Sequence, residues 1–126
     1  MKNYKDSEIW KCSIELYKEI VPLLSTLQEK KLFRLRDQLE ASAGSISDNI
    51  AEGFGRMGNK EVIQFLTISN GSCYECENQI TRAHFTGSID EFTYKKLVEM
   101  CNTISRQIIG LIKYLKDNEF KGTKFK

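Results

Sequence analysis

The chain has 126 residues, of which 40% are hydrophobic and 29% are charged. This length is close to that of one domain, and the composition is ordinary for a soluble globular protein. The net charge of +2 is too small to indicate nucleic-acid binding by itself. A single proline and eight glycines provide few turns, which argues against an all-β protein and favours long helices.

Neither a secretory signal nor a membrane span is visible in the sequence. Residues 1–6 lack the apolar core of a signal peptide, and no apolar run approaches the ~18 residues that a span requires. We therefore expect a soluble, cytoplasmic protein with no membrane partner. Its four cysteines are expected to be reduced thiols.

The first predicted helix covers residues 7–27. Ser7 is a good N-cap residue, and Pro22 is expected either to kink the helix or to end and restart it. The apolar residues that we expect to be buried recur at spacings of three and four. They are Trp10, Ile14, Tyr17, Val21 and Leu24.

The second predicted helix covers residues 32–54, and half of its stripe is small or polar. That stripe consists of Leu35, Leu39, Ser42, Ile46, Asn49 and Gly53. We expect the helix to stop within residues 53–58, where Gly55 and Gly58 offer left-handed geometry at its C-terminus.

The third and fourth predicted helices cover residues 59–86 and 90–117. Asn59 is expected to cap the third helix, Gly87 to end it, and Ser88 or Asp90 to cap the fourth. The predicted buried residues are Val62, Leu66, Ser69, Cys73, Cys76, Ile80, Ala83, Leu97, Cys101, Ile104, Ile108, Leu111 and Leu115. Residues 118–126 are polar, basic and contain a glycine, so this tail is expected to fray.

Four amphipathic helices joined by short connections predict an all-α, antiparallel up-down-up-down four-helix bundle. We expect residues 1–126 to form this bundle as a single domain.

No catalytic, metal-binding or cofactor-binding constellation is predicted. Cys73 and Cys76 lie in the middle of a helix on its apolar stripe, so core packing is favoured over zinc or redox chemistry. His84 is the only histidine and lies near a helix end, where a side chain is usually solvated or bonded to carbonyls. We therefore expect no enzymatic activity.

Residues 45–56 place small and polar side chains on a stripe that should be core. One interpretation is structural: Ser42 and Gly53 let helices approach closely, Asn49 satisfies backbone groups near the third helix, and Glu52 pairs with Arg56. The other interpretation is a subunit interface or a ligand surface at this end of the bundle. The two are compatible.

Several short motifs together resemble a bacterial four-helix-bundle family whose members are often encoded by intervening sequences in large-subunit ribosomal RNA genes. The motifs are Gln38-Leu39, Ser45-Ile46, residues 49–56 (Asn-Ile-Ala-Glu-Gly-Phe-Gly-Arg), Lys60-Glu61, Gln64-Phe65-Leu66, Gly71-Ser72 and Glu75-Cys76-Glu77. The resemblance spans residues 10–115, and its signature or interface residues here are Asn49, Glu52, Gly53, Phe54 and Arg56.

The resemblance implies a ring-shaped homopentamer. It also implies kinship with the accessory protein of diversity-generating retroelements, a basic pentameric bundle that binds nucleic acid and a reverse transcriptase. Where the family often has basic residues, this chain has Glu40, Ala41 and Asn70, and a common proline is replaced by Ser47. The lost charges weaken the inference of nucleic-acid binding more than that of the fold.

Two functions follow as hypotheses, and both include self-association. The first is an oligomeric module that binds RNA or DNA or accompanies a ribonucleoprotein, with avidity from repeated copies. Its candidate contacts are Lys30, Lys31, Arg34, Arg36, Arg56, Lys60, Lys121, Lys124 and Lys126. The alternative is a protein-interaction scaffold with no nucleic-acid role, in which Tyr4, Tyr74 or Tyr94 anchors a partner.

Overall fold

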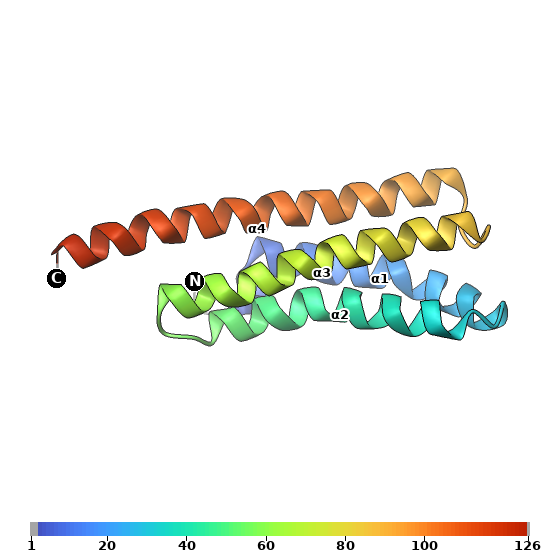
Figure 1. Ribbon diagram of the computed structural model, residues 1–126, viewed down its shortest axis with the longest axis horizontal. Helices are drawn as coiled ribbons and strands as arrows, with labels where there is room; N and C mark the ends of the chain where they lie inside the picture. Colours follow the sequence, from blue (N-terminus) through green and yellow to red (C-terminus); the bar gives the residue numbers. More distant parts are fainter. Residues whose placement is uncertain (1–2, 126) are drawn as a thin grey trace.

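The computed structural model describes residues 3–125, with side chains described for residues 3–118, and this part of the chain is helical. A short 3-10 helix, η1 (Tyr4–Asp6), precedes four α-helices: α1 (Glu8–Glu29), α2 (Phe33–Phe54), α3 (Asn59–Phe85) and α4 (Glu91–Phe125). Helix α2 packs against α1 and α3, and α4 packs against α3 and α1 (Figure 1). Successive helices run in opposite directions, so the predicted antiparallel four-helix bundle is confirmed.

The bundle has two different ends (Figure 1). The α1–α2 connection, residues 30–32, and the α3–α4 connection, residues 86–90, lie together at what we call the paired-loop end. The α2–α3 connection, residues 55–58, lies at the opposite end with the start of α1. Since a helix rises ~1.5 Å per residue, the 22 residues of α2 separate the two ends by roughly 30 Å.

Helix α1 starts as predicted but passes through its proline. The Ser7 hydroxyl accepts a hydrogen bond from the main-chain N–H of Trp10 at 3.4 Å, which confirms the N-cap. The helix neither ends nor restarts at Pro22. Ile20 and Leu23 are buried on the two sides of the proline, so both halves of α1 are held on the same core.

The predicted buried face of α1 is wrong by about one position. The residues that enter the core are Ile9, Ser13, Leu16, Ile20, Leu23 and Leu27. They recur at the same helical spacing as the predicted set, which lies on the neighbouring side of the helix and is only partly covered. Val21, for example, is 45% exposed. Two adjacent apolar stripes run along α1, and packing against α2 and α4 selects one of them.

The small and polar residues of α2 form a close seam with α3. The buried Ser69 hydroxyl donates to the main-chain oxygen of Ile46 at 2.8 Å, which ties the two helices together. A Cβ on Gly53 would lie 3.3 Å from the Cβ of Phe65, so any larger residue here would require Phe65 to shift by a small distance. The structural interpretation of this stripe is therefore supported.

The predicted cores of α3 and α4 are largely confirmed. Three of the predicted residues are only half-buried, namely Val62, Leu111 and Leu115, and the others are buried. Additional buried polar residues enter from these helices: Ser72, Gln79 and Ser105.

The connections differ from the prediction in where the left-handed backbone lies. Gly55 and Gly58 have φ values of −83° and −106°, so neither is left-handed. The main-chain N–H groups of Gly55 and Arg56 instead close tight turns onto α2. Positive φ occurs at Lys31 (61°) and Gly87 (73°) among the described residues, and Gly87 ends α3 as expected.

Asn59 does not cap α3, because Gly58 occupies the N-cap position and Asn59 is the first residue of the helix. Its Nδ2 instead donates to the main-chain oxygen of Leu115 at 3.2 Å, which joins the start of α3 to α4. Asp90 does cap α4: its Oδ1 accepts from the N–H of Thr93 at 2.7 Å.

Helix α4 is longer than predicted. It continues to Phe125 and extends past the other helices at the opposite end, where we expected a frayed tail (Figure 1). The residues after 117 include several that favour helix, and Gly122 is the only glycine among them. Without a proline or a capping turn, nothing in this segment ends the helix.

Candidate functional site

Most side chains of the signature segment, residues 49–56, are used in local structural contacts. Asn49 Nδ2 donates to the main-chain oxygen of Ser45 at 2.8 Å, so it acts within α2 and not at the junction with α3 as expected. The predicted Glu52–Arg56 ion pair forms. Phe54 is half-buried against the core. These residues leave little free chemistry for a ligand.

Arg56 is a poor candidate for a nucleic-acid contact. Besides Glu52, Glu61 lies 4.0 Å from its guanidinium, which also stacks 4.8 Å above the ring of Phe65. Two carboxylates compensate its charge, and the aromatic ring covers one side of the guanidinium.

The structure divides the predicted basic contacts between the two ends of the bundle. Lys30, Lys31 and Arg34 lie at the paired-loop end, whereas Arg56 and Lys60 lie at the opposite end. Arg36 forms an ion pair with Asp37 at 2.7 Å and lines the groove between α1 and α2. The side chains of Lys121 and Lys124 lie outside the described side chains, and Lys126 lies outside the described residues. No single patch contains them all.

A basic pocket of about 350 Å³ lies at the paired-loop end. Three cationic side chains line it: Lys31 from the α1–α2 connection, Arg34 from the first turn of α2, and Arg82 from the last turn of α3. We call it the basic pocket; its other lining residues are Leu32, Phe33, Leu35 and Thr86. None of the lining residues is acidic, so the positive charge there is not balanced within the pocket.

The partners of these cations leave their charge available. Arg82 donates to the neutral Oε1 of Gln38 at 3.2 Å, and neither Lys31 nor Arg34 forms an ion pair with any described residue. No side chain caps the N-terminus of α2, and its first turn holds no acidic residue. The helix dipole therefore adds to the positive potential of the pocket.

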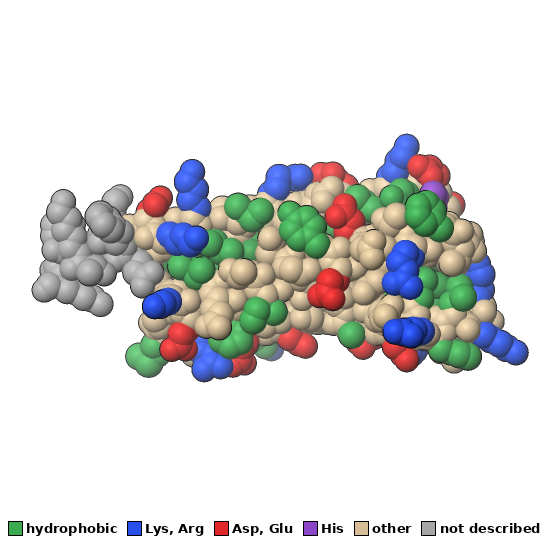
Figure 2. Space-filling model, viewed as in Figure 1, with side chains coloured by type: hydrophobic (Ala, Val, Ile, Leu, Met, Phe, Trp, Pro, Cys, Tyr) green, Lys and Arg blue, Asp and Glu red, His purple; other side chains and the backbone are tan. Residues whose placement is uncertain are grey.

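The view of this surface agrees with that description (Figure 2). Lysine and arginine side chains lie beside hydrophobic ones at both ends of this face, the paired-loop end included, and they are sparser along the middle. Sequence reasoning missed Arg82 and Phe33. Arg82 lies far along the chain from Lys31 and Arg34, and only the antiparallel packing of α2 and α3 brings it to the pocket.

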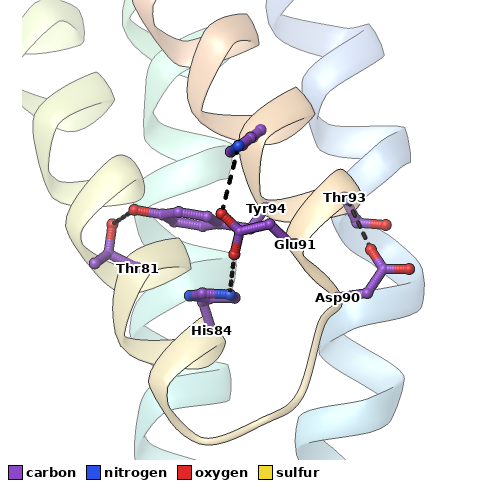
Figure 3. Close-up of polar contacts among 7 residues, drawn as sticks. Thr81, His84, Asp90, Glu91, Thr93 and Tyr94 are labelled. Carbon is purple, nitrogen blue, oxygen red and sulfur yellow. Dashed lines mark hydrogen bonds and ion pairs between the residues drawn. The ribbon is translucent and has the colours of Figure 1, made fainter.

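A second polar cluster fixes the turn beside the pocket (Figure 3). The imidazole of His84 stacks on the ring of Tyr94, with centroids 4.2 Å apart and planes 9° from parallel. Its Nε2 lies 2.9 Å from a carboxylate oxygen of Glu91. We expected His84 to be solvated or bonded to helix carbonyls. Its side chain is only 25% exposed, and its contacts with Tyr94 and Glu91 join the end of α3 to the start of α4.

The cysteines lie where a core role requires. Cys73, Cys76 and Cys101 are buried together between α3 and α4. Burial is the main cause that raises the pKa of Cys73 to about 12, and the hydrogen bond with Cys76 and burial raise that of Cys101. Such thiols are neutral and unreactive at physiological pH. Over the described residues, no group of three or more His, Cys, Asp or Glu side chains is placed to hold a metal ion.

Helix α1 presents an apolar face that the bundle covers only in part. We call it the α1 apolar face; it consists of Trp10, Ile14, Tyr17, Val21 and Leu24. Three of these residues line a groove of about 460 Å³ between α1 and α2. In that groove the Tyr17 hydroxyl donates to Glu40 at 2.8 Å, and this hydrogen bond raises the pKa of Tyr17. No helix in the described part of the chain is long and apolar enough to cross a membrane.

With the fold and these surfaces described, the chain can be compared with known proteins. None of the curated proteins matches it. A crystal structure from Bacteroides thetaiotaomicron VPI-5482, described as a protein with unknown function from the S23 ribosomal protein family, is similar, with a TM-score of 0.79 and 26% sequence identity. The similarity covers 83% of this chain and 98% of that one. The family described as 23S rRNA-intervening sequence protein matches residues 5–110. The chain therefore belongs to the family of 23S rRNA-intervening sequence proteins.

Proposed function

We propose that this protein is an oligomeric nucleic-acid-binding module that holds a phosphodiester strand at the basic pocket. The observation that carries the proposal is the convergence of Lys31, Arg34 and Arg82 on a pocket without acidic residues. Arginine binds phosphate oxygens through paired N–H groups, and lysine adds a point charge. A weak overall charge of +2 is compatible with this, because the local arrangement decides the field.

The second part of the proposal is self-association, which would repeat the basic pocket. The α1 apolar face is partly exposed, and α3 exposes Ile68 and Tyr74 on its outer side with Gly71 between them. A Cβ on Gly71 would meet nothing within 4 Å, so within one copy the glycine is not required by packing. We propose that the α1 apolar face of one copy packs on this outer side of α3 in the next.

The positions of these faces suit a ring. Helices α1 and α3 each pack against α2 and α4 and are therefore diagonal in the bundle. A contact between two different faces is heterologous, and repetition of such a contact closes a ring when the rotation permits. The homopentamer implied by the family resemblance is an assembly of this kind. Repeated pockets would raise the affinity for a long strand through effective concentration.

Titration of labelled RNA and DNA tests the nucleic-acid part. The triple variant Lys31→Asn, Arg34→Gln, Arg82→Gln removes the three charges, and asparagine tolerates the positive φ at residue 31. We expect this variant to bind much more weakly and to have a shallower dependence of log K on log salt by about 2, as expected for three phosphate contacts on a single strand. Lys60→Gln, at the opposite end, is the matched control and should bind like the wild type.

The outcome of that titration also separates the two functional hypotheses. Failure of the wild type to bind any polynucleotide below about 100 µM at low salt would exclude the proposal. A triple variant that binds like the wild type would show that the pocket is not the site. Only the absence of binding by the wild type would favour the protein-interaction scaffold, for which the partly exposed α1 apolar face is the supporting observation.

Sedimentation equilibrium or light scattering tests the self-association. Val21→Lys places a charge on the α1 apolar face at an exposed position, so the bundle itself should fold normally. We expect it to shift the protein toward the monomer. Glu15→Lys changes an exposed residue elsewhere on α1 and should leave the assembly unchanged. A wild type that remains monomeric at high concentration would contradict the ring.

A further inference from the structure

We infer that the basic pocket is selective for single-stranded polynucleotides because one unpaired base stacks on Phe33. This inference rests on the proposed nucleic-acid binding. Phe33 is the first residue of α2 and lines the pocket between Lys31 and Arg34 in the sequence, with Arg82 contributed by α3. An aromatic ring surrounded by cations is the arrangement that single-strand binding requires, since the bases stack while the charges contact the backbone.

Phe33 differs in exposure from the two most exposed aromatic residues near this end. Phe85 and Phe92 are 80% and 78% exposed, so little packing holds their rings. Phe33 is 48% exposed, so about half of its surface is covered by the protein and the rest is open to a ligand. A stacking platform needs both covered and open surface.

The chemistry of the pocket favours an unpaired base over a duplex. In a double helix the faces of the bases are covered by their neighbours, so only a strand whose bases are unstacked can offer one to Phe33. The pocket volume of about 350 Å³ lies within the range of small-ligand sites. The pocket has three cations, so more than one phosphate of a strand that is bound there can find a partner.

The experiment compares strands that share phosphates but differ in their bases. Fluorescence anisotropy would measure binding of three labelled probes, each with about ten nucleotides per strand: oligothymidylate, the same backbone with abasic sites, and a duplex. The test variant is Phe33→Leu, which keeps apolar volume at the half-buried position but removes the flat ring. Phe33→Tyr keeps the ring and serves as the rescue, and Phe92→Leu is the control for an exposed aromatic residue outside the pocket.

We expect the wild type to bind oligothymidylate about 5- to 100-fold more tightly than the abasic strand. This is the difference in affinity expected from one base stacked on an aromatic ring. Phe33→Leu should reduce the affinity for oligothymidylate to that for the abasic strand and leave the latter unchanged. Phe33→Tyr and Phe92→Leu should behave like the wild type.

The two proposals fail in different ways. Equal affinity of the wild type for oligothymidylate and either other probe would overturn the stacking inference, and so would an equal loss in Phe33→Leu and Phe92→Leu. The proposed function would survive both results if the triple variant Lys31→Asn, Arg34→Gln, Arg82→Gln no longer bound the abasic strand. If no probe binds the wild type, both proposals are overturned together.

Discussion

Lys30 donates a hydrogen bond from its Nζ to the main-chain oxygen of Thr86, although 56 residues separate them in the chain. This contact joins the α1–α2 connection to the α3–α4 connection at the paired-loop end. Because Thr86 lines the basic pocket, Lys30 holds one wall of the pocket in place and is less available to a ligand than Lys31.

Replacement of Lys30 should therefore act mainly on stability. Lys30→Met keeps the aliphatic stem and removes the donor, so we expect the free energy of unfolding to fall by about 0.5–1 kcal/mol, as for a solvent-exposed hydrogen bond. Urea denaturation followed by circular dichroism measures this. Lys11→Met, at an exposed position on α1, is the control and should be within error of the wild type. Equal stability of the two variants would contradict the role of Lys30.

The close approach of α2 and α3 at Gly53 can be tested with a pair of glycine substitutions. In Gly53→Ala the new Cβ would lie 3.3 Å from that of Phe65, whereas a Cβ on Gly110 would meet nothing within 4 Å. Both changes favour the helix by about 1 kcal/mol, but only the first causes crowding. We expect Gly53→Ala to be less stable than Gly110→Ala by about 1–2 kcal/mol in chemical denaturation. Equal gains in stability would show that α3 relaxes freely.

A buried hydrogen bond between Ser42 and Gln79 should show coupling. The Ser42 hydroxyl donates to Oε1 of Gln79 across the α2–α3 seam, and both residues are buried. Ser42→Ala leaves the amide oxygen without this donor, which should lower the free energy of unfolding by about 1–3 kcal/mol. Adding Gln79→Leu should recover part of the loss, so the double-mutant cycle should give a coupling of about 0.5–1.5 kcal/mol. Additive effects would argue against the bond.

The four thiols should differ sharply in reactivity. Cys12 is partly exposed, whereas Cys73, Cys76 and Cys101 are buried. At mildly alkaline pH we expect a thiol reagent to modify Cys12 quickly and the other three only on unfolding, because the folded bundle keeps the reagent away from the buried thiols. Mass spectrometry of the labelled peptides provides the readout. Rapid labelling of Cys73 in the folded protein would contradict its raised pKa.

The raised pKa of Cys73 also predicts the direction of an alkaline effect. Its thiol has a pKa of about 12 in the folded protein and an ordinary value near 9 when unfolded. The folded state therefore retains the proton more strongly, and the stabilisation is fully present below about pH 9 and lost as the pH rises towards about 12. Urea midpoints measured across this window should fall less steeply in Cys73→Ala than in the wild type.

The cap at Asp90 predicts a change at acid pH. Its hydrogen bonds with Thr93 hold the pKa of the carboxyl below its usual value. The stabilisation is thus present above the unfolded pKa and is lost as the pH falls through the folded pKa. We expect Asp90→Ala to lower the thermal midpoint at neutral pH and to match the wild type in strong acid. Asp90→Asn retains a capping oxygen without the charge, so its midpoint should show less of this pH dependence.

Local signals in the sequence were enough to predict the four helices and most of their core, but not the face that α1 buries. Ile9, Leu16 and Ile20 recur with the same spacing as Trp10, Tyr17 and Val21, so periodicity alone cannot choose between the two stripes. The choice depends on which stripe packs against α2 and α4, and that is a tertiary property. Asn59 likewise has a good capping residue type, but its side chain finds a partner on α4.

The candidate site could be predicted only in part. Lys31 in the α1–α2 connection and Arg34 in the first turn of α2 lie close together in the chain, so both were recognisable from the sequence. Arg82 enters the pocket through the register of α3 against α2, which no local pattern reports. Arg56 was predicted as a nucleic-acid contact from its charge. In the folded chain Glu52 and Glu61 compensate that charge.

The arrangement of the bundle ends has a practical consequence. Helix α1 begins and α4 ends far from the basic pocket, at the other end of a bundle roughly 30 Å long. A fluorophore or affinity handle joined near either terminus would therefore report on oligonucleotide capture without covering Phe33. The same geometry allows the protein to be immobilised through its termini with the paired-loop end facing solution.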